Sequence, residues 1–121
     1  SYADQGTLLM AKYLFEAGNH ALALDAIKPL MSRENSVIAS TAKLRTASVY
    51  LELGQHEEAL SALDIGNAKG FEGLYYNLIG DIFLDLGSNE EAKNNYSLAI
   101  DNITENSSLS QLVQIKLDDL N

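Results

Sequence analysis

The chain has 121 residues, 46% of them hydrophobic, which is enough apolar material for the core of one compact domain. Seventeen acidic and eight basic side chains leave a formal net charge of -9, which argues against nucleic acid and anionic lipid surfaces as partners. Cysteine is absent, which excludes disulfides, thiolate metal sites and cysteine nucleophiles.

One six-residue pattern occurs three times along the chain. Three bulky apolar or aromatic residues precede an acid, a small or aliphatic residue and a glycine, at residues 13–18, 49–54 and 82–87. A small residue stands seven positions before each glycine and an alanine five positions after it: Ala11, Ala47, Gly80, Ala23, Ala59 and Ala92. Helices cross closely only where side chains are small, and glycine favours the left-handed conformation that ends many helices. Each occurrence therefore predicts an antiparallel helix pair.

The first predicted pair covers residues 4–32, with helices near 4–17 and 20–32. Pro29 lies inside the second of these helices. Because proline removes a backbone hydrogen bond, we expect it to bend or shorten that helix.

The second and third pairs follow at the same spacing, near residues 36–65 and 71–102. Their helices are predicted near 36–53, 56–65, 71–86 and 89–102. Turn-forming residues at positions 65–70 predict a loop between the pairs. Ser88 with Glu91 fits a capping box at the start of the last of these helices.

A closing helix is predicted near residues 108–120. Ser108 and Gln111 fit a capping box there, and apolar residues at helical spacing would pack on the third pair. The sequence thus predicts an all-α fold, a tetratricopeptide-like α-α superhelix of three helix pairs plus a C-terminal capping helix. We expect residues 1–121 to form a single domain of this kind.

The spacing of the glycines resembles that of the tetratricopeptide repeat, and a narrower resemblance is visible at dispersed positions. These positions are 43–45, 50–55, 59–60, 62–64, 69–71, 80–82 and 114–117. There the chain resembles the YfgM-type ancillary subunits of the bacterial SecYEG translocon. The resemblance implies a periplasmic domain on the inner membrane that associates with the translocon and the chaperone PpiD. Because the sequence begins at Ser1 and not at Met, we expect the membrane anchor to lie outside this chain.

A groove for a partner protein is expected along the first helix of each pair, as in other tetratricopeptide arrays. The repeat register identifies nine candidate residues: Lys12, Phe15, Glu16, Arg45, Ser48, Glu52, Asn77, Asp81 and Asp85. Asp81 and Asp85 argue against capture of a peptide's terminal carboxylate. They favour a partner segment that carries basic and apolar residues.

Residue types associated with catalysis have structural explanations. His20 and His56 both follow a repeat glycine by two positions, which indicates a recurring packing role and not a metal site. The paired acids at 57–58 and 90–91 begin helices, where they complement the positive helix end. No nucleophile, histidine base or oxyanion loop accompanies them. We therefore predict a protein that is not an enzyme, with no cofactor, metal or small-molecule substrate.

Two other functional interpretations stay open. The chain could be a generic tetratricopeptide adaptor in another envelope assembly, such as outer-membrane biogenesis, pilus or lipoprotein machinery. A membrane helix upstream of Ser1 would favour the translocon interpretation, whereas a lipoprotein signal or a second repeat domain there would favour the adaptor. An enzyme, the third class, would require turnover that a point change in the groove abolishes.

Overall fold

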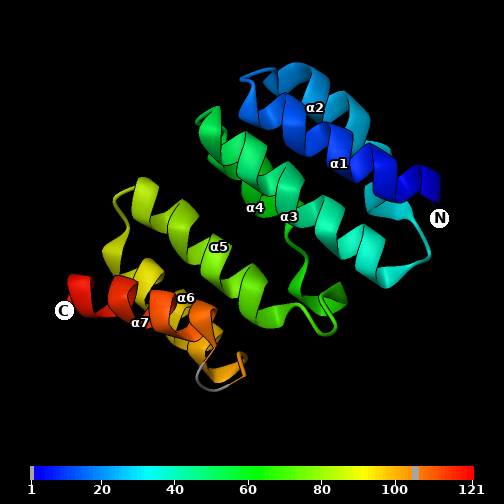
Figure 1. Cartoon of the computed structure of the whole chain (residues 1–121). Coiled ribbons are helices and arrows are strands. Elements are labelled where there is room, and N and C mark those ends of the chain that lie inside the picture. Colours follow the sequence, from blue (N-terminus) through cyan, green and yellow to red (C-terminus); the bar gives the residue numbers. More distant parts are fainter. Residues whose placement is uncertain (1, 105–106) are drawn as a thin grey trace. The chain divides into compact units, whose positions relative to one another are not determined.

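The computed structural model describes residues 2–104 and 107–121, and these residues form helices and no strand (Figure 1). The helices are α1 (Tyr2–Glu16), α2 (His20–Ile27), α3 (Ser36–Glu52), α4 (His56–Ala62), α5 (Glu72–Asp85), α6 (Asn89–Asp101) and α7 (Ser108–Leu120), with 3-10 helices η1 (Lys28–Ser32) and η2 (Ile65–Asn67). The all-α class, the three helix pairs and the closing helix are confirmed.

The helices are grouped in two compact units, which meet in the sequence at Ala62 and Leu63. The first unit contains α1 to α4 and η1, and the second contains η2 and α5 to α7.

The three repeat glycines end α1, α3 and α5 in the same way. Gly18, Gly54 and Gly87 have φ angles of 82°, 73° and 79°, which is the left-handed region that glycine tolerates best. In the first turn, the Gly18 amide donates to the Phe15 carbonyl at 3.0 Å and the Asn19 amide donates to the Leu14 carbonyl at 2.8 Å. The other two turns repeat this pair of bonds. This is the Schellman arrangement, and it confirms the predicted role of these glycines.

The predicted capping boxes are wrong in detail. Ser88 does precede α6, but its side chain makes no capping hydrogen bond, and its amide already donates to the Phe83 carbonyl at 2.9 Å. The connection is so short that Ser88 both completes the turn after α5 and stands at the start of α6. This double position gives Ser88 a ψ angle of 73°, whereas serines that cap helices usually have extended backbone angles. At α7 the cap is Ser107 and not Ser108, because the Ser107 hydroxyl accepts from the Ser110 amide at 3.0 Å.

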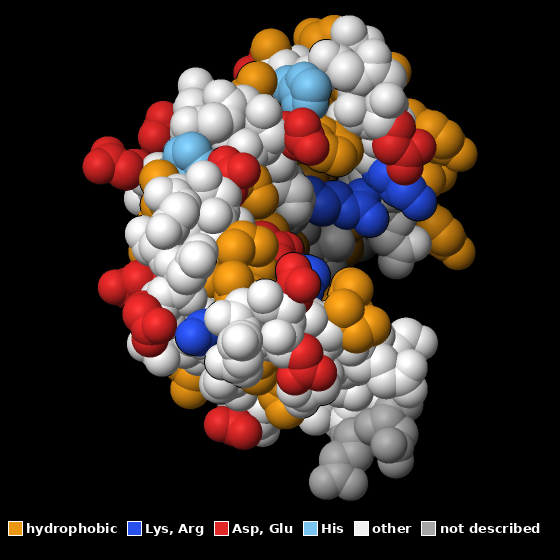
Figure 2. Space-filling model, turned by 90° about the vertical axis from the view of Figure 1, so that its left-hand side faces the viewer, with side chains coloured by type: hydrophobic (Ala, Val, Ile, Leu, Met, Phe, Trp, Pro, Cys, Tyr) orange, Lys and Arg blue, Asp and Glu red, His pale blue; other side chains and the backbone are white. Residues whose placement is uncertain are grey.

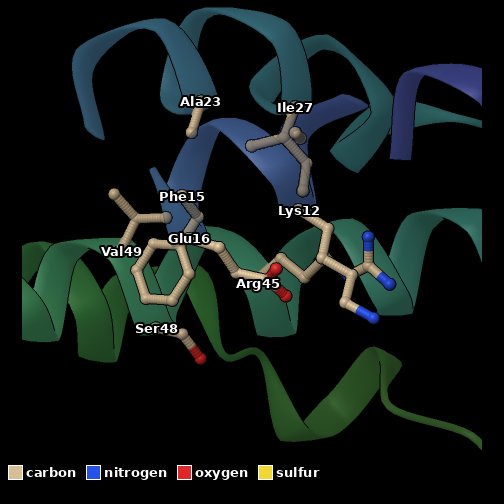
Figure 3. A pocket seen from close by; sticks show the side chains of 9 residues that line it. Lys12, Phe15, Glu16, Ala23, Ile27, Arg45, Ser48 and Val49 are labelled. Carbon is tan, nitrogen blue, oxygen red and sulfur yellow. The ribbon is translucent and has the colours of Figure 1, made fainter. Parts of the chain in front are cut away.

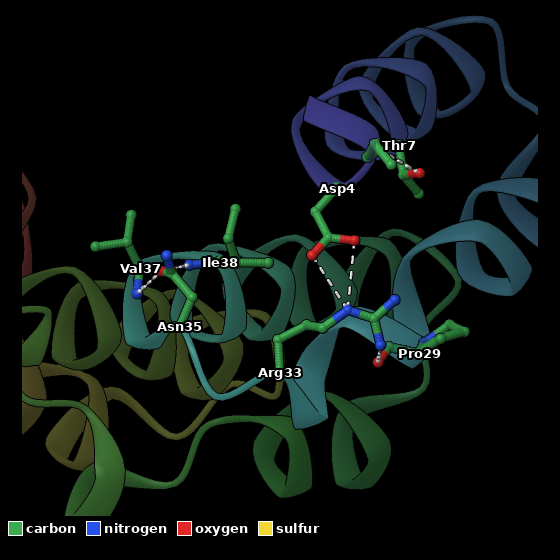
Figure 4. Close-up of polar contacts among 8 residues, drawn as sticks. Asp4, Thr7, Pro29, Arg33, Asn35, Val37 and Ile38 are labelled. Atoms are coloured by element: carbon green, nitrogen blue, oxygen red, sulfur yellow. Dashed lines mark hydrogen bonds and ion pairs between the residues drawn. The ribbon is translucent and has the colours of Figure 1, made fainter. Parts of the chain in front are cut away.

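Pro29 shortens the second helix as predicted. Regular α-helix stops at Ile27, and the chain continues as η1 with the proline near its start. After η1, Arg33 pairs with Asp4 of α1 at 3.2 Å, and the Asn35 side chain caps α3 by accepting from two backbone amides (Figure 4). The first helix pair therefore ends at Pro29 and the ion pair of Arg33, and the second begins at the Asn35 cap.

The fourth helix is shorter than predicted and ends at Ala62. The segment predicted as a loop contains the single turn η2, where the Asp64 carboxylate accepts from the Gly66 amide at 3.1 Å. A short aspartate-centred turn of this kind competes with a continued α-helix, because the side chain replaces the helical hydrogen-bond partner.

Small residues at the predicted crossings are buried. Ala47, Ala59 and Ala92 are each 0% exposed, and Ala11 and Ala23 are nearly so. In the second unit the sixth such position is Gly80, which lies against the ring of Tyr96 in α6. Backbones therefore approach closely where the sequence predicted that they would.

Each unit has its own apolar core. In the first unit the core joins α1, α2, η1 and α3: Leu8, Ala11, Ile27, Leu30, Ile38 and Ala42. In the second unit one buried cluster comes from α6 and α7: Ala92, Tyr96, Ala99 and Val113. Val113 is fully buried, so α7 covers the third pair in the way expected of a capping helix.

Candidate protein-binding site

A pocket of about 280 Å³ lies between α1, α2 and α3 in the first unit (Figure 3). Its lining comes from residues at helical spacing on these three helices: Ala11, Lys12, Phe15, Glu16, Ala23, Ile27, Arg45, Ser48 and Val49. Residues three or four positions apart share one helix face, so the register that buries Ala11 also presents Phe15 to the pocket. The structure thus brings together five of the nine predicted groove residues.

The floor of the pocket is apolar. Ala11, Ala23, Ile27 and Val49 are all buried, with exposed fractions of 3% or less. Phe15 forms one wall and is held in place by an edge-to-face contact with His20, at 5.4 Å between ring centroids. Two alanines and one bulky aromatic residue leave a concave space, because the alanines that allow the helices to cross do not fill it.

Basic side chains gather at one end of this pocket. The nitrogen-bearing ends of Lys12 and Arg45 lie near each other there, whereas the Phe15 ring lies at the opposite end (Figure 3). Arg45 is oriented by α1, because its guanidinium donates a hydrogen bond to the Leu8 carbonyl. Across residues 2–104 and 107–121, neither Lys12 nor Arg45 forms an ion pair.

The basic end of the pocket is unusual for a chain with a net charge of -9. On the face shown in Figure 2, carboxylates are scattered widely and basic side chains are gathered in a few places. Glu16 also lines the pocket and is exposed, so the local charge is that of two cations and one anion. Ser48 uses its hydroxyl proton on the Leu44 carbonyl at 3.0 Å, which leaves the oxygen as an acceptor.

Three of the remaining predicted residues lie in the second unit, and the fourth lies elsewhere in the first. Glu52 is the exposed last residue of α3 and is not among the residues that line the pocket. Asp85 is the exposed last residue of α5. Asn77 and Asp81 lie on α5 and belong to a separate polar cluster.

That cluster connects α5, α6 and α7. The Lys116 ammonium of α7 donates to Asn77 Oδ1 at 3.0 Å and to both carboxylate oxygens of Asp81, at 3.0 and 3.2 Å. The Tyr96 hydroxyl of α6 donates to Asp81 at 2.6 Å, and the Lys116 ammonium lies 5.6 Å from the centre of the Tyr96 ring. Asp81, on which the expectation of a basic partner depended, is therefore engaged within the chain.

The same contacts change the acidity of Tyr96. Burial of the phenol, followed by its hydrogen bond to Asp81 and the negative charge of that carboxylate, raises the pKa of Tyr96 far above the usual value for tyrosine. The hydroxyl therefore stays protonated and available as a donor at physiological pH. Lys116 was not singled out in the sequence as a contact of Asp81, because the two residues are 35 positions apart and belong to different helices.

The part of the chain that the structure describes contains no group of three or more histidine, cysteine or acidic residues able to hold a metal ion. Among the same residues, no helix is both long and apolar enough to cross a bilayer.

Stacked helix pairs with a lined pocket are typical of repeat proteins that bind other proteins. The family model of the tetratricopeptide repeat-like domain matches residues 1–121. The chain belongs to this family.

Two curated relatives make the comparison more specific. Over 121 residues, 99% of this chain and 58% of the relative, the chain is 36% identical to the ancillary SecYEG translocon subunit of Aggregatibacter actinomycetemcomitans. Over 119 residues, 98% of this chain and 57% of the relative, it is 31% identical to the ancillary SecYEG translocon subunit of Neisseria gonorrhoeae. The chain thus spans a little over half the length of these relatives, and the resemblance to ancillary translocon subunits is confirmed.

Proposed function

We propose that this chain is the tetratricopeptide repeat-like part of an ancillary subunit of the SecYEG translocon, and that it binds proteins without catalysing a reaction. The observation that carries the proposal is similarity along nearly the whole chain to two proteins with that name. The pocket between α1, α2 and α3 supports a binding role, because it combines an apolar floor with a few polar groups at its edge.

The proposed location is the periplasmic face of the bacterial inner membrane, with the anchor in a segment outside this chain. A translocon component works at that membrane, and the chain's acidity disfavours direct adsorption to anionic lipid. The proposed partners are the translocon itself and a PpiD-type periplasmic chaperone. Of the nine groove residues predicted from the repeat register, the five that line the pocket form the proposed contact surface of the first unit, and the other four remain proposed contacts, each within its own unit.

Site-specific photo-crosslinking in the native host tests the partner. The full-length protein would carry a photoreactive phenylalanine at Phe15 in the pocket or, as a matched control, at Tyr13 on the same helix. Tyr13 is 63% exposed and does not line the pocket. We expect the Phe15 position to form adducts with a translocon or chaperone subunit, identified by mass spectrometry, and the Tyr13 position to form fewer. Adducts only with subunits of another envelope assembly would favour the generic adaptor instead.

Protease accessibility tests the location independently. When the outer membrane is permeabilised and the inner membrane is intact, added protease should degrade this domain of the full-length protein. Protection under these conditions, with degradation only after lysis, would place the domain on the cytoplasmic side and contradict the proposal.

A further inference from the structure

The two ends of the pocket between α1, α2 and α3 differ in chemistry, and this difference indicates what the pocket binds. One end is built from the Phe15 ring and the buried Val49, and the other ends in the Lys12 and Arg45 nitrogens (Figure 3). A ligand that matches both ends must present an apolar group and a negative charge side by side.

The size of the pocket sets the scale of that ligand. A volume of about 280 Å³ lies just below the range for pockets that enclose whole small molecules. It suits one large apolar side chain from a partner, with the rest of the partner outside.

The nitrogen-bearing ends of Lys12 and Arg45 lie near each other at the basic end of the pocket (Figure 3). Arg45 is fixed by its bond to the Leu8 carbonyl, and Lys12 is exposed and makes no ion pair within the described ranges 2–104 and 107–121. Two like charges near each other repel, and a bound carboxylate would relieve that repulsion. Glu16 lines the same pocket and would repel further carboxylates, which favours a ligand with a single acid at the basic end.

The backbone of the pocket offers no nest of free amides for a chain-terminal carboxylate. Capture of a terminal carboxylate commonly uses a nest of free backbone amides. Every lining residue lies within α1, α2 or α3, where backbone amides are used in helical hydrogen bonds, and the one nearest a helix start, Ala23, donates to the Asn19 carbonyl at 3.0 Å. The pocket therefore offers an anion only the side chains of Lys12 and Arg45.

We propose that this pocket binds an internal segment of a partner protein in which a large apolar side chain stands beside a single aspartate or glutamate. The apolar side chain enters between Phe15 and Val49, and the neighbouring carboxylate pairs with Lys12 and Arg45. This inference rests on the proposed function, because it names the chemistry by which the proposed protein-binding site recognises its partner.

The test uses acetylated and amidated synthetic peptides, which have no terminal charges. One peptide carries a Phe-Glu pair flanked by glycine and serine, and its relatives carry Phe-Gln, Phe-Lys or Ala-Glu at the same two positions. Binding to the 121-residue chain is measured by NMR titration. We expect the Phe-Glu peptide to bind and to shift the Val49 and Ala23 methyl signals, and each of the other peptides to bind about tenfold more weakly.

Reversing the charge at Lys12 distinguishes a specific loss of peptide recognition from a general loss of structure. Lys12→Glu should weaken binding of the Phe-Glu peptide about tenfold and restore binding of the Phe-Lys peptide, because the attractive pair is re-formed with its signs exchanged. Lys69→Glu makes the same charge change at an exposed residue of the second unit and should leave both affinities unchanged. Gain of Phe-Lys binding cannot come from a misfolded pocket.

Several results would overturn the inference. No shift of the Val49 or Ala23 signals by the Phe-Glu peptide, equal binding of Phe-Glu and Phe-Lys, or binding only by peptides with a free terminal carboxylate would each do so. These outcomes leave the proposed function untouched if Phe15 of the full-length protein still crosslinks to the translocon or a chaperone. Conversely, peptide recognition as expected without such crosslinks would contradict the proposed function alone.

Discussion

At the residue scale, Gly80 at the third helix crossing has a different task from the glycines of the three turns. Gly80 is helical, and a Cβ atom placed there would lie 2.5 Å from Cε1 of the Tyr96 ring. The ring is fully buried and its hydroxyl is bonded to Asp81, so it has little freedom to move away. The absence of a side chain at Gly80 is therefore a packing requirement.

Gly80→Ala should destabilise the fold by about 1–3 kcal/mol, because the added methyl group overpacks the contact with Tyr96. The matched control is Gly6→Ala in α1, where an added Cβ has no atom within 4 Å. There alanine should stabilise the helix by about 0.5–1 kcal/mol. Urea unfolding followed by circular dichroism measures both changes, and equal effects at the two positions would contradict the role assigned to Gly80.

Tyr96 should make stability depend on alkaline pH. Its pKa is raised in the folded state, so above a pH of about 10 the tyrosine of the unfolded chain loses its proton while the folded one keeps it. The contribution of Tyr96 is thus complete below that pH and is lost as the pH rises further.

Comparison with Tyr96→Phe isolates this effect, since both proteins carry the same other tyrosines and lysines. At neutral pH the substitution should cost about 1 kcal/mol through loss of the hydrogen bond to Asp81. The difference in free energy of unfolding between the two proteins should shrink from about pH 9 to about pH 11. A difference that stays constant over this range would show that the phenol is not shielded as described.

At the element scale, α7 is joined to the third helix pair by apolar burial and by the polar contacts of Lys116. Val113 supplies the buried anchor, and Lys116 reaches across to Asp81 on α5. The lysine and aspartate side chains are 23% and 29% exposed, so the ion pair is partly shielded from water. It should therefore contribute more than an ordinary surface pair.

A double-mutant cycle with Lys116→Gln and Asp81→Asn should give a coupling energy of about 1 kcal/mol. The surface pair of Lys93 and Glu90, 3.5 Å apart with Glu90 85% exposed, serves as the control and should give less than about 0.5 kcal/mol. Hydrogen exchange of the α7 amides should accelerate in Lys116→Gln. Exchange that accelerates equally in α2 would indicate general destabilisation instead of loosening of α7.

Predictions about elements succeeded where the signal was local. Pro29 ended α2 within two residues, because a missing amide and a steric clash act on the immediate turn. The capping box at Ser88 failed, because the Ser88 amide is already used by the turn at Gly87 and that turn dictates the backbone angles. Competition between two adjacent motifs for one residue is not visible in either motif alone.

At the scale of the whole molecule, the expectation that residues 1–121 form a single domain stays a prediction. The chain contains no tryptophan, so the fluorescence of a single inserted tryptophan reports only on the unit that carries it. Tyr13→Trp would report on the first unit and Leu112→Trp on the second, both at exposed positions. If the chain is one cooperative domain, fluorescence of the two variants should give the same urea midpoint as circular dichroism. Midpoints that differ between reporters would show two domains.

Part of the candidate site could be predicted from helical spacing, as the helices themselves could. Lys12, Phe15 and Glu16 follow from the register of one helix, and Arg45 and Ser48 follow from the equivalent positions of the next first helix. The floor residues Ile27 and Val49 were missed, although their helical spacing from Ala23 and Arg45 is a signal that could have identified them.

The sequence alone determined the all-α class, the three helix pairs, the glycine-ended turns and the resemblance of the chain to the tetratricopeptide repeat-like family. These properties depend on periodicity and on backbone preferences within a few residues, which a linear pattern records. Only the tertiary structure decided that Asp81 is neutralised by Lys116 and that Lys12 and Arg45 converge at the end of an apolar pocket. Contacts of this kind join residues more than thirty positions apart, and their geometry is set by how helices pack and not by any local preference.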